Sequence, residues 1–389
     1  TTTRSSLQIA EELELIGASA RANSGVDGSF MTLNVLKKHL AKGLDIFADI
    51  LLHPTFPEKE FDRLKRQRLT ALAQQKDQPT TIANNAYSYI LYGADHPYGN
   101  NAAGTEASLG AMTRDELVTF YQTYFRPNNA TLVIVGDVTM DEILPSLEKA
   151  MGAWAPAAVP PFAIQDPKPI DKTRVFLVDK PGAPQSEVRI GYPALSRNTP
   201  DFFPVVVMNR LLGGQFSSRI NLNLREKHGY TYGANSSFRF NKGAGPFTAQ
   251  GGIVTEKTDS AMREFRNEIE LMREKGMDEK EMAFVKNGLI GNFALTFETP
   301  AQIAGALQNV VLYGLPENYY NEYLRNIDKV TLADVNAAAK KYLDADKMAM
   351  VVVGDLSKIQ AGIEKMHFGD VVLCDTDGKP LPFIKNPEK

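Results

Sequence analysis

An internal repeat constrains this chain more than any other feature. Residues 56–79 align with residues 277–300, 221 positions later, and both segments carry Glu-Lys-Glu at the same place. Residues 113–125 align with residues 331–343, 218 positions later, and in each copy the chain then reaches Val-Gly-Asp. Order and spacing are therefore kept through two copies, which predicts a duplicated domain rather than one continuous core.

Each copy is predicted to combine helices with short strands. Thr113 and Thr331 are good helix N-caps, and each is followed three residues later by an acid, the arrangement of a capping box. Continuous apolar runs at 130–137 and 348–355 are typical of strands. The predicted fold class is α/β (α+β), with two homologous domains, each a mixed sheet with helices packed on one face, that form a half-clamshell.

A proline-rich segment separates the two copies. Seven prolines lie between Ala155 and Pro184, and since proline donates no backbone hydrogen bond, much of this stretch is predicted to be an extended linker. After His367, an Asp-Gly pair and two prolines indicate irregular chain. The predicted organisation is a first domain at 1–155, a linker at 156–171, a second domain at 172–366 and an irregular tail at 367–389.

The composition excludes several classes of protein. The chain has 389 residues, 43% of them hydrophobic, and a formal net charge of −3, which predicts a soluble globular protein without a nucleic-acid-binding stripe. Its one cysteine, Cys374, cannot form an internal disulfide, and no apolar run approaches the roughly 20 residues of a membrane helix. Because no methionine precedes Thr1, we expect a processed or trimmed product whose first domain lacks its N-terminal part.

Several polar residues that could attract a functional interpretation have simpler explanations. The carboxylates of Glu11, Glu12 and Glu14 are predicted to form a solvated helix face. His53 and His96 each precede a proline and are predicted to be loop residues rather than metal ligands.

The sequence LREKHGYTY, residues 224–232, places a guanidinium and a phenol on either side of a glycine. A helix capped by Ser217 or Ser218 is predicted to end near Gly229, which supplies a left-handed stop, so that Arg225 leaves its last turn. Tyr232 then begins a strand and is predicted to share one face with Ala234, Ser236, Phe238 and Phe240. The reversal between helix and strand can direct both polar tips to one place, where they would offer hydrogen bonds to a carbonyl or oxyanion.

Residues 211–238, LLGGQFSSRINLNLREKHGYTYGANSSF, resemble the signature segment of the second homologous domain in the insulinase/pitrilysin family of zinc peptidases. The duplication, the segment PGAPQSEVRIGY from Pro181 and the two Val-Gly-Asp endings resemble the same family, so the likeness covers nearly the whole chain. The resemblance implies that Arg225 and Tyr232 are the pair that holds the substrate backbone opposite the zinc. Their first-half counterparts are Leu13 and Ala20, so only the second copy carries the pair.

The family's metal site is where this sequence departs. The family uses His-x-x-Glu-His, in which two histidines bind zinc and the glutamate is the general base, and a distant glutamate as third ligand. No two of the five histidines here are four residues apart, and the motif's expected place lies before Thr1. The third-ligand position, eight residues before Pro79, is Ala71, whose methyl group cannot bind a metal, and its second-half counterpart is Asn292.

The resemblance therefore implies a non-catalytic subunit of a heterodimeric zinc peptidase. Such a chain would bind peptide substrate and complete the active site of a homologous partner that carries His-x-x-Glu-His and the zinc, or it would associate with a second copy of itself. One alternative is a purely structural family member without a peptidase partner. The other is an active zinc peptidase whose motif precedes Thr1, and this alternative must account for Ala71.

Overall fold

The computed structural model describes residues 1–382 and divides the chain into two compact units. The first unit comprises residues 1–72, 102–163 and 295–315, and the second unit comprises residues 73–101, 164–294 and the chain from 316 onward. None of the helices in residues 1–382 is both long and apolar enough to cross a membrane.

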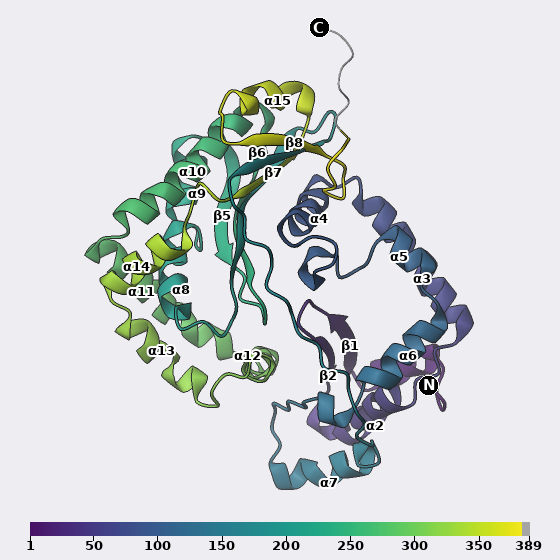
Figure 1. Cartoon of the computed structure of the whole chain (residues 1–389). Helices are drawn as coiled ribbons and strands as arrows, with labels where there is room; N and C mark the ends of the chain where they lie inside the picture. The colour runs from purple at the N-terminus through teal and green to yellow at the C-terminus, as the bar shows by residue number, and fades with distance from the viewer. Residues whose placement is uncertain (383–389) are drawn as a thin grey trace. The chain divides into compact units, whose positions relative to one another are not determined.

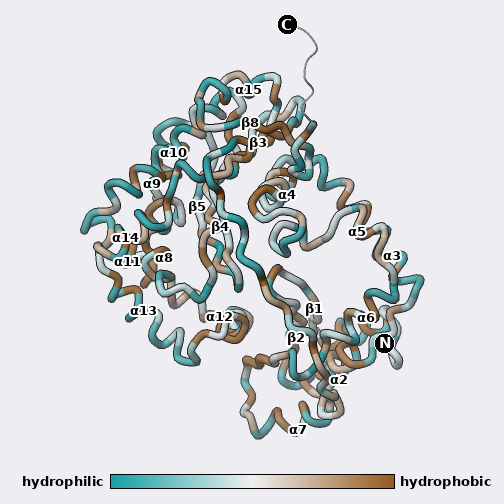
Figure 2. Tube along the Cα trace, in the orientation of Figure 1, coloured by the Kyte–Doolittle hydropathy of each residue, from teal (hydrophilic) through white to brown (hydrophobic). Residues whose placement is uncertain are grey.

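The second unit is built on a six-stranded mixed sheet (Figure 1). Its strand order is β5 (Thr231–Phe238), β6 (Gly245–Val254), β4 (Gln185–Leu195), β7 (Ala349–Gly354), β3 (Arg174–Asp179) and β8 (Asp370–Cys374). β3 runs parallel to β7 and β8, whereas the other neighbours are antiparallel. Figure 2 shows the hydrophobic character of β3 and β8, as expected for strands within a covered sheet.

Most helices of the second unit pack on one face of this sheet and form the main core. They are α8 (Phe202–Leu212), α9 (Arg219–Asn221), α10 (Thr258–Lys275), α11 (Glu279–Phe293), α13 (Tyr319–Lys329), α14 (Leu332–Tyr342) and α15 (Leu356–Glu364). The mixed α/β fold class is therefore confirmed.

One helix covers the other face of the sheet, which the sequence did not predict. α4 (Pro79–Tyr92) belongs to the first repeat but packs on β4 and β7 in the second unit. Its buried residues form a second core with Val178, Val351 and Val353. The Tyr87 hydroxyl donates a 2.8 Å hydrogen bond to the Phe247 carbonyl oxygen.

The first unit is mainly helical. It contains α1 (Ser6–Leu15), α2 (Leu40–Leu52), most of α3 (Glu58–Gln75), α5 (Glu106–Ala111), α6 (Arg114–Tyr124), α7 (Met140–Met151) and α12 (Pro300–Tyr313). Its one described sheet pairs β1 (Ser19–Ser24) with β2 (Ser29–Asn34). α12 is the second-repeat counterpart of α4, so each unit contains this helix from the other repeat.

The order of elements follows the predicted repeat. α3 and α4 begin 221 residues before α11 and α12, respectively. Thr113 and Thr331 both form the predicted capping boxes, at the starts of α6 and α14. The helices of the duplication and their caps are therefore confirmed.

Two predictions about strands are wrong. Residues 130–137 form no strand, although their counterparts form β7. β7 is hydrogen-bonded between β3 and β4, and residues 1–129 contain no counterparts of these two strands for 130–137 to join. The tail from His367 is not irregular throughout, because residues 370–374 form β8, and the Asp-Gly pair makes the turn that follows it, with Gly378 at φ +83°.

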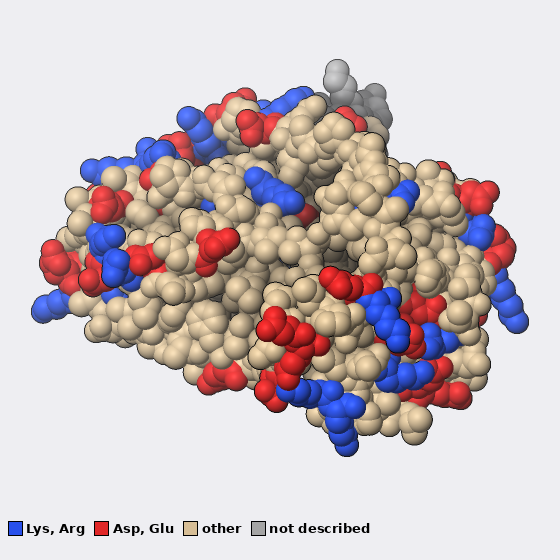
Figure 3. Space-filling model, turned by 90° about the horizontal axis from the view of Figure 1, so that it is seen from below, with Lys and Arg blue, Asp and Glu red and all other residues tan. Residues whose placement is uncertain are grey.

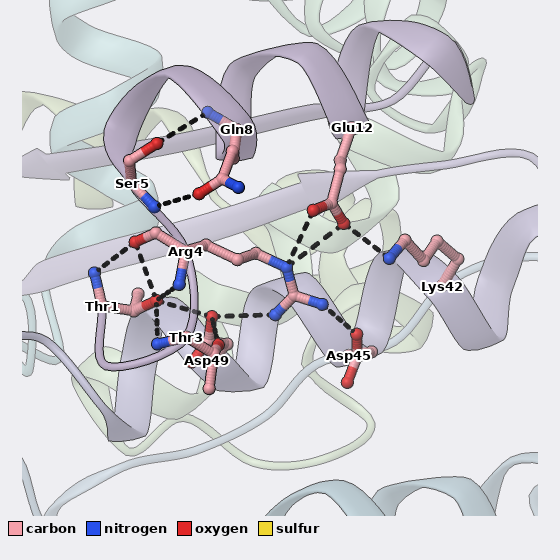
Figure 4. Close-up of polar contacts among 9 residues, drawn as sticks. All are labelled: Thr1, Thr3, Arg4, Ser5, Gln8, Glu12, Lys42, Asp45 and Asp49. Atoms are coloured by element: carbon pink, nitrogen blue, oxygen red, sulfur yellow. Dashed lines mark hydrogen bonds and ion pairs between the residues drawn. The ribbon is translucent and has the colours of Figure 1, made fainter.

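A cluster of charged and hydroxyl side chains joins the start of the chain to α1 and α2 (Figure 4). The Arg4 guanidinium contacts Glu12, Asp45 and Asp49, and Glu12 also pairs with Lys42. Glu12 is therefore an ion-pair partner and not simply part of a solvated face. Burial acts to raise the pKa of the Asp49 carboxyl, but its three hydrogen bonds outweigh this and hold the pKa below its usual value.

Replacing Arg4 should destabilise the first unit in a pH-dependent way. Arg4→Met leaves the Asp49 carboxylate, which is 6% exposed, without its cation, and should lower the free energy of unfolding at pH 7 by about 3 kcal/mol. Because the folded-state pKa of Asp49 is depressed, the stabilisation is present above the unfolded-state pKa and is lost as pH falls through the folded-state value.

Thermal unfolding of both proteins between pH 7 and pH 3 measures this difference. The gap in Tm between wild type and Arg4→Met should narrow as the pH approaches 3. A gap that stays constant over this range would show that Arg4 acts through packing and not through its charge.

Candidate functional site

The segment 211–238, which carries the candidate pair Arg225 and Tyr232, packs closely against the sheet of the second unit. α8 ends at Leu212, and the following loop passes so close to β5 that a Cβ atom on Gly213 would lie 2.2 Å from the Ser236 nitrogen. The Ser236 N–H donates to the Gly213 carbonyl oxygen at 3.1 Å. Glycine at 213 is therefore required for a close approach of two backbones.

The predicted helix before Gly229 is present, but its second part is a π-helix. α9 covers residues 219–221, and residues 222–227 continue it as a π-helix. Ser218 stands at the N-cap position and is buried, but its side chain makes no capping hydrogen bond. Single π-turns are uncommon and occur often at functional sites.

Gly229 reverses the chain as predicted. Its φ is +64°, in the left-handed region that glycine adopts without strain. Its N–H donates to the Arg225 carbonyl oxygen at 3.1 Å, and the Tyr230 N–H donates to the Leu224 carbonyl oxygen at 2.9 Å. The turn therefore fixes the direction in which the chain leaves the π-helix and enters β5.

Tyr232 does not lie on the predicted face of β5. Thr231 pairs with Ile253 and Ala234 pairs with Gly251, so two residues, Tyr232 and Gly233, stand opposite Gly252 alone. This β-bulge breaks the alternation of side chains. Ala234, Ser236 and Phe238 do share one face, which is buried, whereas Tyr232 is 88% exposed.

Arg225 leaves the π-helix and lies over an aromatic ring. The guanidinium carbon is 4.6 Å from the centroid of the Phe216 ring, and Nε is 3.4 Å from Oε1 of Glu226. Its side chain is 36% exposed. Within residues 1–382, no hydrogen bond joins Arg225 to Tyr232, and the Tyr232 hydroxyl has no protein partner.

The first repeat provides an internal comparison. Gly17, the counterpart of Gly229, also has a left-handed φ, of +61°. Leu13 and Ala20, which replace the arginine and tyrosine, are buried or half-buried in one apolar cluster with Ile16 and Ile46. β1 pairs with β2 without a change of register. Both repeats therefore make the same turn, but only the second presents polar groups around it.

The residues of this chain do not fit the zinc site that the family resemblance implies. Ala71 lies on α3 and offers only a methyl group, and Asn292 is exposed on α11. Within residues 1–382, no group of three or more His, Cys, Asp or Glu side chains is arranged to hold a metal ion. His96 is buried, with Nδ1 accepting from the Tyr98 N–H and Nε2 2.9 Å from the Gln165 carbonyl oxygen. Both of its ring nitrogens are therefore engaged in holding a loop.

Two further residues contribute to the site but were not identified from the sequence. Phe216 stacks under Arg225, and the buried Asn221 makes hydrogen bonds to both neighbouring segments. The only signal for Asn221 was a polar residue between Ile220 and Leu222, within the turn that packs on the sheet. Such a residue needs hydrogen-bond partners when it is buried, but the sequence does not say which they are.

Comparisons with known proteins agree with the fold and with the family resemblance. Residues 1–105 match the family model described as insulinase (peptidase family M16), and residues 111–289 match the model described as peptidase M16 inactive domain. Among curated proteins, the uncharacterized zinc protease YmxG of Bacillus subtilis is 25% identical over 89% of this chain and 83% of its own length. The non-peptidase homolog YmxG of Helicobacter pylori is 25% identical over 90% of this chain and 80% of its own length.

Two solved structures resemble this chain in fold. The peptidase M16 inactive domain from Pseudomonas fluorescens is 26% identical, with a TM-score of 0.83 over 91% of this chain and 85% of that chain. A protease from Helicobacter pylori shares the fold, with 19% identity and a TM-score of 0.79 over 89% of this chain and 84% of that chain. Matches to both family models, which together span most of the sequence, and the likeness in structure lead to one conclusion: the chain belongs to the insulinase (M16) peptidase family.

Proposed function

We propose that this chain is the non-catalytic subunit of a heterodimeric zinc peptidase of the insulinase type. It binds an extended peptide and completes the active site of a homologous partner. The observation that carries this proposal is the arrangement around Gly229, where the exposed Tyr232 hydroxyl and the Arg225 guanidinium stand on either side of a fixed turn.

The environment of this turn suits a peptide backbone. Among the described strands β5 pairs only with β6, so it forms one edge of the sheet. An extended peptide can add to such an edge through backbone hydrogen bonds. A peptide bound beside Tyr232 and Arg225 would present a carbonyl oxygen to a phenol and a guanidinium, which are both hydrogen-bond donors.

The two donors would contribute most when negative charge develops on that oxygen. Donors that are already in place stabilise an oxyanion without reorganising during the reaction. The homologous partner, with its His-x-x-Glu-His motif, would supply the zinc and the general base, since the described residues of this chain contain no group of three or more side chains arranged to hold a metal ion. The division of labour explains how Ala71 and the Arg225/Tyr232 pair occur in one chain.

The charge distribution supports a peptide as ligand better than a nucleic acid. On the face drawn in Figure 3, acidic and basic side chains are intermingled and form no continuous basic surface. The formal net charge of −3 agrees with this. Nucleic-acid binding depends on a concentrated positive field, and neither the face drawn in Figure 3 nor the net charge provides one.

A structural role without a peptidase partner is the second candidate. The name of one relative, the non-peptidase homolog YmxG of Helicobacter pylori, favours it. A structural role would not require an exposed tyrosine beside an arginine. The two candidates therefore differ in whether the function needs Tyr232. An active enzyme with its own zinc is disfavoured by Ala71, which occupies the third-ligand position.

The zinc content of the purified full-length protein is the first test. We expect less than stoichiometric zinc and no cleavage of unstructured peptides by the protein alone, because Ala71 removes one of three protein ligands. Metal analysis after dialysis, beside a peptide-cleavage assay, measures both. One tightly bound zinc per chain, lost when any histidines upstream of Thr1 are replaced, would refute a non-catalytic role.

The second test concerns the donor pair in a reconstituted complex with a homologous His-x-x-Glu-His subunit. Arg225→Ala or Tyr232→Phe should lower kcat roughly 100-fold, since each removes one donor to the developing oxyanion. Folding and pairing should be unchanged, because Tyr232 is 88% exposed and Arg225 makes only surface contacts. Peptide cleavage and size-exclusion chromatography measure the two properties.

The first repeat supplies the matched control. Ala20→Ser introduces a hydroxyl at the position equivalent to Tyr232, within the apolar cluster, and should leave kcat within about twofold. If both donor variants assemble and cleave peptides at the wild-type rate, the pair has no catalytic role and the structural candidate is preferred.

A further inference from the structure

The buried side chain of Asn221 connects the two segments that carry the donor pair. Asn221 is 4% exposed. Its Nδ2 donates a 2.7 Å hydrogen bond to the Phe216 carbonyl oxygen, and its Oδ1 accepts a 3.1 Å hydrogen bond from the Ala234 N–H. One amide group therefore joins the loop after α8 to the strand that carries Tyr232.

On the strand side, Asn221 supports the β-bulge. The bulge ends at Ala234, whose N–H is hydrogen-bonded to Asn221. Where the bulge begins, next to β6, the Thr231 hydroxyl lies 2.7 Å from the Gly252 carbonyl oxygen and accepts a 3.0 Å hydrogen bond from the Gly233 N–H. The two side chains thus satisfy backbone groups at the bulge, and hold the backbone from which Tyr232 projects.

On the loop side, Asn221 fixes the residue that supports Arg225. The Phe216 side chain is 66% exposed, so burial does little to hold its ring in place. The hydrogen bond from Asn221 fixes the Phe216 backbone instead, and the ring then meets the Arg225 guanidinium at 4.6 Å. Contact between a guanidinium and an aromatic face at this distance is favourable, by about 0.5–1 kcal/mol at an exposed site.

The first repeat shows what the same turn is like without this amide. At the repeat spacing of 212 residues, Ile9 replaces Asn221 and Ala22 replaces Ala234. β1 has no bulge there, since Ala20, Arg21 and Ala22 pair with consecutive residues of β2. The buried amide and the bulge therefore occur together in the second repeat and are both missing from the first.

We propose that Asn221 is a positioning residue, which sets the separation of Arg225 and Tyr232 by tying the Phe216 loop to the bulge in β5. The proposal rests on the proposed function for its catalytic consequence. The hydrogen bonds that it invokes can be tested in the isolated chain, because every contact involved lies within the second unit.

The test compares Asn221→Leu with a matched control, Asn209→Leu. Asn209 also joins a helix to β5, with Nδ2 3.0 Å from the Ser236 carbonyl oxygen and Oδ1 accepting from the Ser236 hydroxyl at 2.7 Å. Its side-chain hydrogen bonds reach Ser236, and neither Phe216 nor the bulge. Both variants remove an amide that braces the same strand, so they should lower Tm by similar amounts while differing in their effect on the site.

Amide hydrogen exchange in the isolated chain is the first measurement. Asn221→Leu should accelerate exchange at Ala234 and in residues 215–218, whereas Asn209→Leu should accelerate exchange near Ser236 and at Gly213 and Gly214, which lie against Asn209 and Ser236. Asn221→Ala is a smaller variant in case the leucine variant does not fold. It removes both hydrogen bonds without adding bulk, so exchange should again rise at Ala234 and in residues 215–218.

Turnover by the reconstituted complex is the second measurement. Asn221→Leu should lower kcat on the order of 10- to 100-fold, since small misplacements of binding groups have effects of this size, and Asn209→Leu should leave kcat near the wild-type value. Unchanged exchange at Ala234, or equal losses of kcat in the two leucine variants, would overturn the positioning role. A wild-type complex without activity would refute the proposed function, while the exchange data would still decide whether Asn221 holds the two segments.

Discussion

The sheet of the second unit depends on being covered on both faces. β7 is buried along its whole length, with Met350 and Val352 in the main core and Val351 and Val353 in the core formed with α4. Without α4 these valines would be exposed, at a cost of about 1.5–3 kcal/mol for each side chain. A Cβ atom on Gly191 would lie 2.5 Å from the Tyr87 hydroxyl, so β4 is also shaped to receive this helix. The second repeat therefore cannot complete its fold from its own residues, because α4 comes from the first.

The segment that carries Arg225 and Tyr232 arises from a difference between two otherwise similar turns. Gly17 and Gly229 adopt the same left-handed conformation after a helix, so the turn itself is a property of the repeat and not of function. In the first repeat the flanking positions are apolar and pack on the short sheet. In the second, the helix becomes a π-helix, the strand acquires a bulge, and two polar side chains emerge. The bulge requires hydrogen bonds to stabilise it, and Asn221 and Thr231 supply them.

The sequence predicted what is encoded locally. The caps at Thr113 and Thr331, the helices of the repeat and the glycine stop at 229 depend on neighbouring residues, and the structure contains all of them. It did not predict what depends on distant partners. Residues 130–137 have an apolar pattern like that of β7, but a strand forms only beside other strands, and its partners are not found in the first 129 residues. The strand face on which Tyr232 lies was mispredicted for a related reason, since alternation assumes a regular register and the bulge depends on contacts with Asn221 and Thr231.

An exposed side chain can be part of an accurate binding site only if its backbone is rigid. Within residues 1–382, Tyr232 is 88% exposed and no hydrogen bond or ring contact holds its ring in place, so its two side-chain torsions stay free until a ligand binds. Its backbone, by contrast, lies within a bulge that is hydrogen-bonded from both sides. Arg225 is similar, with its backbone fixed in the π-helix and its guanidinium resting on an exposed ring. In the proposed site, the backbones of the two residues are fixed and the ends of their side chains can adjust. This combination suits the recognition of the backbone carbonyl, a group that every peptide shares, more than the recognition of any one side chain.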